Sequence, residues 1–174
     1  VANLSQDCYT FTLGPGFGDI TYLVTLDQIF KYKYRNTSPQ HFSKIIMLPL
    51  HSAEQLKKAT KLNLKKFNIP KNSIVSGSTN MWKTFFGDGE ILLEGIAALI
   101  RRYPFYHHIF IGTPRCLDNL ENYLMKNPDL RENIHYIGPV QNIYRILKSL
   151  DFWVNSFPTT GGSNIEMANM GKPT

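Results

Sequence analysis

The chain has 174 residues, of which 43% are hydrophobic and 18% charged, with a formal net charge of +6. This composition supports a buried core and excludes a wholly disordered chain, a collagen and, with only two cysteines, a disulfide scaffold. The basic balance fits a nucleic acid, a membrane surface or a phosphorylated ligand as partner, and it equally fits a protein that binds none of these.

The first 70 residues have the pattern of short strands joined by turns. Apolar runs predict strands over residues 8–13, 20–26 and 45–50. Residues 52–67 have helical composition and begin with a capping box of Ser and Gln. The stretch that follows contains Pro70 and has the composition of a loop, so we expect a junction between two parts of the chain near this residue.

Strands and helices alternate regularly after this junction. Strands are predicted over residues 73–78, 107–111, 134–137 and 152–155, and helices over 90–103, 117–126, 143–150 and 164–170. The last helix is expected to end at Gly171. On the first helix, one face is expected to gather Ile91, Leu92, Ile96, Leu99 and Ile100. Alternating βα units predict an α/β fold, a Rossmann-like parallel sheet with helices on both faces.

Small or polar residues follow four of the predicted strands. They occupy residues 78–80, 112–114, 138–141 and 159–163. In parallel sheets, ligands bind beyond the carboxyl ends of the strands. These four connections therefore predict one shared crevice.

The strongest chemical signal is the sequence Pro-Thr-Thr-Gly-Gly-Ser-Asn-Ile-Glu after the last strand. Gly161 and Gly162 let the backbone approach an oxygen-rich group, and a helix that begins near Ser163 directs free N–H groups toward it. With the hydroxyls of Thr160 and Ser163, this forms an anion site suited to a diphosphate. Glu166 could accept hydrogen bonds from vicinal sugar hydroxyls, such as those of a ribose. The alternative is that Ser163 and Glu166 form only a capping box, and the two roles are compatible.

Other reactive side chains give weaker signals. Lys83 follows a predicted strand and could neutralise a diphosphate as a point charge, although a surface lysine is the simpler interpretation. His107, His108 and His135 fall in predicted strands, so structural roles are expected. No His, Cys and Asp cluster has metal-site spacing, so no metal is predicted. The sequence contains no dinucleotide fingerprint, Walker loop or serine-hydrolase motif.

Taken together, these residues resemble the donor-binding half of a GT-B glycosyltransferase. More narrowly, the resemblance is to the O-linked N-acetylglucosamine transferase family and its bacterial protein-glycosylating relatives. It rests on the segment 157–166, on Gly171-Lys172-Pro173 behind it and on Lys83. It implies that residues 1–70 are the tail of the N-terminal acceptor lobe with the interlobe segment. Residues 71–174 are then a nucleotide-sugar-binding lobe that is truncated at its C-terminal end.

The resemblance also implies roles for individual residues. The implied diphosphate contacts are Lys83, Thr160, Gly161, Gly162 and Ser163. Glu166, where the family often has Asp, is implied to bind the ribose. The connection after residue 137 is similar to the segment that meets uracil, which implies base-binding roles for Val140, Gln141 and Tyr144. The family's acceptor-side catalytic residues lie upstream of this chain, so no catalytic residue is predicted in it.

The expected function is that of a glycosyltransferase fragment, nearly inactive alone, whose parent transfers a sugar from a UDP-sugar to a protein or glycan acceptor. A cytoplasmic protein with no cofactor, metal, nucleic-acid partner or membrane span is expected. Two alternatives stay open: a sugar-nucleotide epimerase of the same fold, and a non-catalytic module that binds nucleotides or nucleic acid. Salt-dependent binding to random DNA would favour such a module.

Overall fold

The computed structural model describes residues 2–5, 20–23, 42–45, 57–79, 90–113, 117–155, 166–168 and 170–174. The chain divides into two compact units, Val1–Pro49 and Leu50–Thr174. The boundary thus precedes the junction that the sequence places near residue 70. The assignment of the two parts to acceptor and donor lobes stays a prediction.

The first unit contains a parallel sheet of three short strands, β1 (Ala2–Ser5), β2 (Ile20–Leu23) and β3 (Phe42–Ile45), in the order β1-β2-β3. β2 confirms the start of the strand predicted over residues 20–26. β3 begins three residues before the strand predicted over residues 45–50. The strand predicted over residues 8–13 lies outside the described residues.

The second unit contains a four-stranded sheet in the order β6-β5-β4-β7, and all its pairings are parallel. Its strands are β4 (Ile74–Thr79), β5 (Tyr106–Ile111), β6 (Ile134–Ile137) and β7 (Phe152–Trp153). All six residues of β5 are buried, as expected for an inner parallel strand covered on both faces. This sheet confirms the predicted α/β class.

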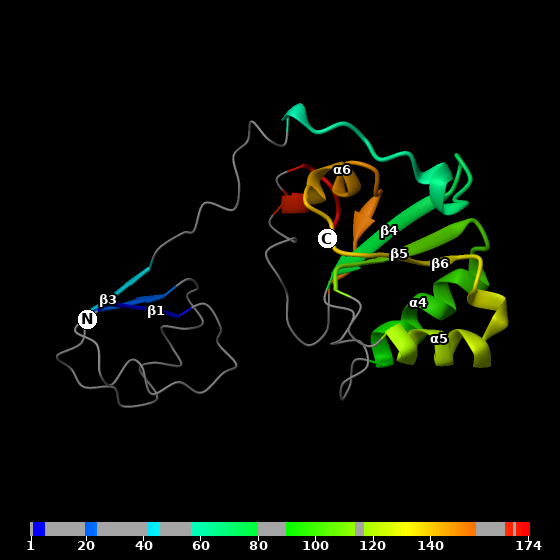
Figure 1. Cartoon of the computed structure of the whole chain (residues 1–174), viewed down its shortest axis with the longest axis horizontal. Helices are drawn as coiled ribbons and strands as arrows, with labels where there is room; N and C mark the ends of the chain where they lie inside the picture. Colours follow the sequence, from blue (N-terminus) through cyan, green and yellow to red (C-terminus); the bar gives the residue numbers. More distant parts are fainter. Residues whose placement is uncertain are drawn as a thin grey trace. The chain divides into compact units, whose positions relative to one another are not determined.

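Helices cover both faces of this sheet (Figure 1). α4 (Glu90–Arg102) and α5 (Leu117–Lys126) lie on one face, and α6 (Ile143–Leu147) lies on the other. Two short 3₁₀ turns, η2 (Leu64–Phe67) and η4 (Pro128–Leu130), also occur among the described residues.

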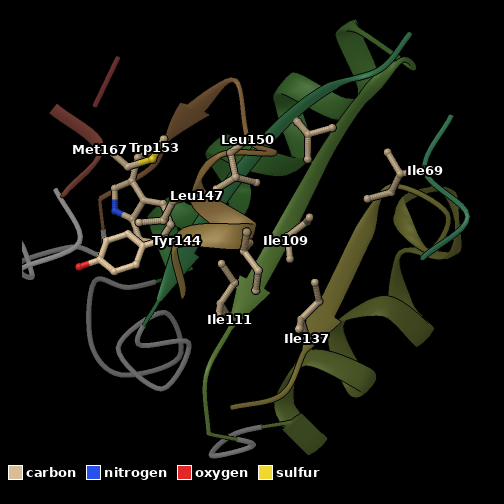
Figure 2. Close-up of a cluster of buried hydrophobic side chains, with 11 residues drawn as sticks. Ile69, Ile109, Ile111, Ile137, Tyr144, Leu147, Leu150, Trp153 and Met167 are labelled. Carbon is tan, nitrogen blue, oxygen red and sulfur yellow. The ribbon is translucent and has the colours of Figure 1, made fainter. Parts of the chain in front are cut away.

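Each face of the sheet has its own hydrophobic cluster. The α4/α5-side cluster consists of Leu93, Ile96, Ala97, Ile100, Tyr106, Phe110, Leu120, Leu124, Leu130 and Ile134. The α6-side cluster, drawn in Figure 2, consists of Ile69, Val75, Ile109, Ile111, Ile137, Tyr144, Ile146, Leu147, Leu150, Trp153 and Met167. Alternate residues of β5 enter opposite clusters, because successive side chains of a strand point to opposite faces.

α4 has nearly the predicted length, but its buried face differs from the prediction. Ile91 and Leu99 are 66% and 40% exposed, whereas Leu93 and Ala97 are completely buried. The buried stripe follows positions 93, 96, 97 and 100, which is also a helical spacing. The helix is therefore rotated relative to the predicted face, and Leu93 and Ala97 take the buried positions expected for Ile91 and Leu99.

The helix predicted over residues 52–67 is present only in part among the described residues. Residues 57 and 58 are helical, residues 59–63 are not, and η2 follows. The backbone N–H of Leu62 instead donates to the Arg145 carbonyl at 3.1 Å and to Ser149 Oγ at 2.7 Å. Because Leu62, Leu64 and Phe67 pack against the α6-side cluster, tertiary contacts outweigh the local helical preference.

The end of the chain's last helix agrees with the prediction. Residues 166–168 are helical, and Gly171 has φ +68°, where a side chain would be strained. The Gly171 N–H donates to Ala168 O at 2.9 Å, and the Lys172 N–H donates to Met167 O at 3.1 Å. Glycine therefore closes this helix with left-handed backbone.

Candidate functional site

The candidate site lies at the carboxyl edge of the four-stranded sheet. The last residues of three neighbouring strands, Thr79, Ile111 and Ile137, are in register, so the connections after them begin side by side. The Gly112 N–H donates to Ile137 O at 3.1 Å, which ties two of these connections together. The strand order reverses between β4 and β7, and ligands of doubly wound sheets bind at such a switch point.

Tyr144 and Glu166 form a buried polar pair beside this edge. Only 6% of Tyr144 and 7% of Glu166 are exposed, and the Tyr144 hydroxyl donates to Glu166 Oε1 at 3.4 Å. In Figure 2 the Tyr144 hydroxyl points away from the other labelled side chains. Burial, followed by the negative charge of Glu166, raises the pKa of Tyr144, so its hydroxyl keeps the proton that it donates.

A hollow of about 530 Å³ opens beside the start of α6, and Tyr144 but not Glu166 is among its lining residues. Its lining includes two predicted base-binding residues, Gln141 and Tyr144. The third, Val140, packs instead against the α6-side cluster. The hollow is thus lined mainly by polar and basic residues, while most of Tyr144 is buried in the α6-side cluster.

Several residues that line the hollow were not predicted from the sequence as site residues. Lys58, Asn142 and Arg145 line it together with residues 59–60 and 143. Asn142 Oδ1 accepts the Tyr144 N–H at 3.1 Å, so Asn142 caps α6, and an Asn before a helix is a readable signal. No sequence pattern points to Lys58, because this residue is far from α6 in the chain and reaches the hollow only in the folded structure.

The predicted site residues are thus brought together only in part. Tyr144 contacts Glu166, and Gln141 shares the hollow with Tyr144. The diphosphate contacts implied for Lys83, Thr160, Gly161, Gly162 and Ser163 fall outside the described residues. For every residue of the set, the predicted ligand role stays a prediction.

His108 has the structural environment expected for it. It is completely buried in β5, with Nδ1 2.7 Å from Ser76 Oγ and Nε2 3.0 Å from Ser78 Oγ. Burial, followed by the charge of His135, lowers the pKa of His108 to about 3, so the ring is neutral at pH 7. A neutral ring between two hydroxyls is a satisfied core group rather than a proton carrier.

The described residues contain neither a metal-binding cluster nor a membrane-spanning helix. No three or more His, Cys, Asp and Glu side chains gather as a metal site in this part of the chain. Among the same residues, no helix combines the length and apolar character needed to cross a bilayer.

Comparison with known proteins identifies the fold. The sequence matches no protein-family model and no curated protein. The structure is similar to that of HepE from Anabaena in complex with UDP and glucose. The TM-score is 0.73 and the identity 15%, over 99% of this chain and 51% of HepE. A glycosyltransferase from Rickettsia africae gives a TM-score of 0.66 and 16% identity, over 98% of this chain and 49% of its own.

A third similar structure is the pneumococcal O-GlcNAc transferase GtfA in complex with UDP and GlcNAc. Here the TM-score is 0.57 and the identity 16%, over 89% of this chain and 29% of GtfA. The chain has the fold of these GT-B glycosyltransferases, as the sequence predicted. It spans about half the length of the first two proteins. The narrower resemblance to the O-GlcNAc transferase family stays a prediction.

Proposed function

We propose that this chain is part of a glycosyltransferase that transfers a sugar from a UDP-sugar to a protein or glycan acceptor. Residues 50–174 bind the donor in this proposal. The carrying observation is the buried Tyr144–Glu166 pair after the carboxyl edge of a GT-B sheet, with Tyr144 also among the residues that line a hollow. The UDP in the structures of HepE and GtfA supports this choice of nucleotide.

The donor is proposed to lie along the carboxyl edge. Gln141 and Tyr144 contact the base, the Glu166 carboxylate accepts hydrogen bonds from the ribose hydroxyls, and Val140 supports the base segment from the core. Lys83 and residues 160–163 neutralise the diphosphate as negative charge grows on the leaving group. A carboxylate repels phosphate, so Glu166 is better placed at a neutral diol than at the diphosphate.

The donor site is proposed to bind its nucleotide without a metal or cofactor. The protein is proposed to act in the cytoplasm. The main positive charges available to the diphosphate are then those of the protein itself. Lys58 and Arg145 line the hollow and add to the positive potential there. Because the chain spans about half of HepE, we expect it to bind donor nucleotide but to turn over slowly alone.

The ribose role of Glu166 is tested by calorimetric binding of uridine and of 2′,3′-dideoxyuridine. Glu166→Ala removes the acceptor of two charge-assisted hydrogen bonds, worth roughly 1.5–3 kcal/mol each before desolvation is subtracted. We expect uridine to bind about tenfold or more weakly to the variant. The affinity for the dideoxy analogue should not change, because that analogue lacks both hydroxyls.

The control is Asp118→Ala, which removes an exposed carboxylate from α5 on the opposite face of the sheet. It should leave both affinities unchanged. The Glu166→Ala variant could instead melt at a lower temperature and still bind uridine more tightly than the dideoxy analogue, to the same degree as the unchanged chain. That result would show that Glu166 supports the fold and that the ribose role is wrong.

A further inference from the structure

Exposed hydrophobic side chains gather at the amino edge of the four-stranded sheet, opposite the carboxyl edge that carries the candidate site. Six large hydrophobic side chains are exposed among the described residues. Four of them lie where α4 ends and where β4 and β5 begin, and they form the amino-edge patch: Ile74, Leu99, Tyr103 and Phe105. These residues are 40–51% exposed, and the proposed function uses none of them.

Contacts between neighbouring residues join the amino-edge patch. The Tyr103 N–H donates to Leu99 O at 2.8 Å, so the two residues follow each other along one side of α4. The rings of Tyr103 and Phe105 have centroids 6.0 Å apart. The Ile74 N–H donates to Phe105 O at 3.1 Å, which holds the start of β4 beside the same turn. The patch is therefore one surface rather than a scatter of exposed residues, and such surfaces mark interaction sites.

Basic residues surround this patch. The Arg102 guanidinium lies 5.4 Å from the centre of the Tyr103 ring. Lys71 is exposed in the turn before β4, and Lys65 and Lys66 are exposed in η2. None of these four basic residues forms an ion pair with another described residue.

η2 lies at the same edge as the patch. A hollow of about 530 Å³ is lined both by Phe67, the last residue of η2, and by Pro104, which separates the two aromatic residues of the patch. The lysines of η2 and the amino-edge patch therefore border a common surface.

The acidic residues of this edge do not cancel its positive charge. The Asp129 carboxylate forms an ion pair with Arg101 at 2.8 Å, so these two charges offset each other. Asp151 accepts the Val75 N–H at 2.8 Å, and Glu132 lines the hollow. Against these last two carboxylates stand the four basic side chains around the patch, so the edge is positive on balance.

We propose that the amino-edge patch and the basic residues around it bind the surface of an anionic lipid bilayer. Aromatic and aliphatic side chains enter the interfacial region of a bilayer, while Lys and Arg meet the lipid phosphates. The carboxyl edge is at the other end of the same strands, so the proposed donor site stays open when the bilayer is bound.

Two other partners fit this surface less well. A nucleic acid would match the positive charge, but its bases stack on aromatic rings and leave the aliphatic side chains of Ile74 and Leu99 without a matching group. A second copy of this chain would match the apolar patch, but it would bring a like charge to the interface.

Co-sedimentation of the full chain with lipid vesicles tests the proposal. One set of vesicles contains phosphatidylcholine alone, and the other also contains about 30 mol% phosphatidylglycerol as the anionic lipid. We expect the chain to bind the anionic vesicles at least about fivefold more tightly than the neutral ones, with a difference that shrinks as salt is added.

Two substitutions separate the apolar and the charged contributions. Phe105→Ser removes the most exposed ring of the patch and should weaken binding to the anionic vesicles about tenfold. Lys71→Ala removes one charge and should weaken it about fivefold. The matched controls are Ile91→Ser, at the other end of α4, and Lys58→Ala, beside the start of α6. Both controls should bind the anionic vesicles as tightly as the unchanged chain.

NMR of the unchanged chain decides the outcome if a variant fails to fold. With anionic bicelles that carry a spin-labelled lipid, the amide signals of residues 71–74 and 102–105 should broaden before those of β6. The proposal is overturned if these signals do not broaden first, if the chain binds no anionic vesicles, or if folded Phe105→Ser and Lys71→Ala bind them as well as the unchanged chain. Equal losses in the two control variants would also overturn it.

The alternative partners give results of their own. If a random DNA duplex binds more tightly than the anionic vesicles and Phe105→Ser abolishes its binding, the surface recognises nucleic acid and the proposal is wrong. A dimer that forms with rising concentration and is lost in Phe105→Ser, without binding to vesicles, would equally replace the bilayer with a second copy of the chain.

Discussion

At the scale of single residues, the Tyr144–Glu166 contact explains how a carboxylate can be buried beside the hollow. A buried charge is costly without hydrogen-bonding partners, and the Tyr144 hydroxyl is one such partner. The same contact fixes the position of one carboxylate oxygen of Glu166. In the proposed function, Tyr144 is therefore a positioning residue for Glu166.

Tyr144→Phe tests this positioning role, because it removes the hydroxyl and keeps the ring. A lost hydrogen bond of this kind is worth about 0.5–1.5 kcal/mol, so uridine should bind about two- to tenfold more weakly. Binding of 2′,3′-dideoxyuridine should stay the same in calorimetric titrations. Tyr123→Phe is the matched control, since Tyr123 donates to Glu94 at 2.7 Å on the far face of the sheet. Equal losses for both nucleosides would show that the hydroxyl does not act through the ribose.

His108 predicts how the stability of the fold depends on pH. Its pKa is about 3 in the folded chain and about 6.5 in the unfolded chain, so unfolding takes up a proton between these values. The contribution of His108 to the free energy of unfolding is therefore fully present above pH 6.5 and is lost as the pH falls toward 3. From pH 7 to pH 5 the loss from this residue should be about 2 kcal/mol. Urea unfolding at several pH values measures it.

A second set of urea curves measures how much of the acid sensitivity comes from His108. His108→Gln should lose about 2 kcal/mol of the difference between pH 7 and pH 5, whereas His51→Gln leaves the buried ring of His108 in place and should retain it. A free energy of unfolding that stays constant between pH 7 and pH 5 in the unchanged chain would contradict the low pKa.

At the scale of elements, α4 offers a comparison within one helix. Leu93 is completely buried in the α4/α5-side cluster, whereas Leu99 is 40% exposed. Leu93→Ala should lower the free energy of unfolding by about 2–5 kcal/mol, because it removes buried methyl groups and leaves a cavity. Leu99→Ala should cost less than about 1 kcal/mol. Urea unfolding of both variants measures these losses. A larger loss for Leu99→Ala than for Leu93→Ala would show that the predicted face of α4, not the observed one, is buried.

The elements also show what could be predicted from the sequence. α5 and β6 have the predicted bounds, because a regular apolar period and turn residues at both ends decide them locally. The buried face of α4 could not be predicted, since Leu92, Leu93, Ile96, Leu99 and Ile100 make two overlapping stripes. The sheet decides between these stripes by packing against Ala97.

The candidate site was predictable to a smaller extent. Glu166 follows the Gly-rich turn in the sequence, so its position near the carboxyl edge could be expected. Its contact with Tyr144 could not, because the two residues are 22 positions apart and belong to different βα units. Lys58 is still further from α6 in the chain, and no local pattern connects the two.

At the scale of the whole molecule, the two units have separate sheets and, in the second unit, separate cores. Both hydrophobic clusters of Leu50–Thr174 draw all their described residues from this unit. The described residues of the candidate site come from it as well. The second unit therefore contains its own cores and the described part of the candidate site.

We expect a chain shortened to residues 50–174 to fold by itself. It retains all four strands, both clusters and the segment 57–69 that packs beside α6. Thermal unfolding should be cooperative, with a midpoint within a few degrees of that of the full chain. Its affinity for UDP should agree within about threefold, since no described residue of the site is removed.

A second chain, shortened to residues 71–174 at the junction that the sequence places near residue 70, is the matched comparison. It loses Ile69, which is buried in the α6-side cluster, and the four partly buried apolar residues Ala59, Leu62, Leu64 and Phe67. It also loses the Leu62 hydrogen bonds to Arg145 and Ser149. Burying one large aliphatic side chain contributes about 1.5–3 kcal/mol, and domains of this size are stable by only about 5–15 kcal/mol. The shorter chain should therefore melt far below the longer one or fail to fold cooperatively. Equal melting temperatures would show that residues 50–70 do not belong to the second unit.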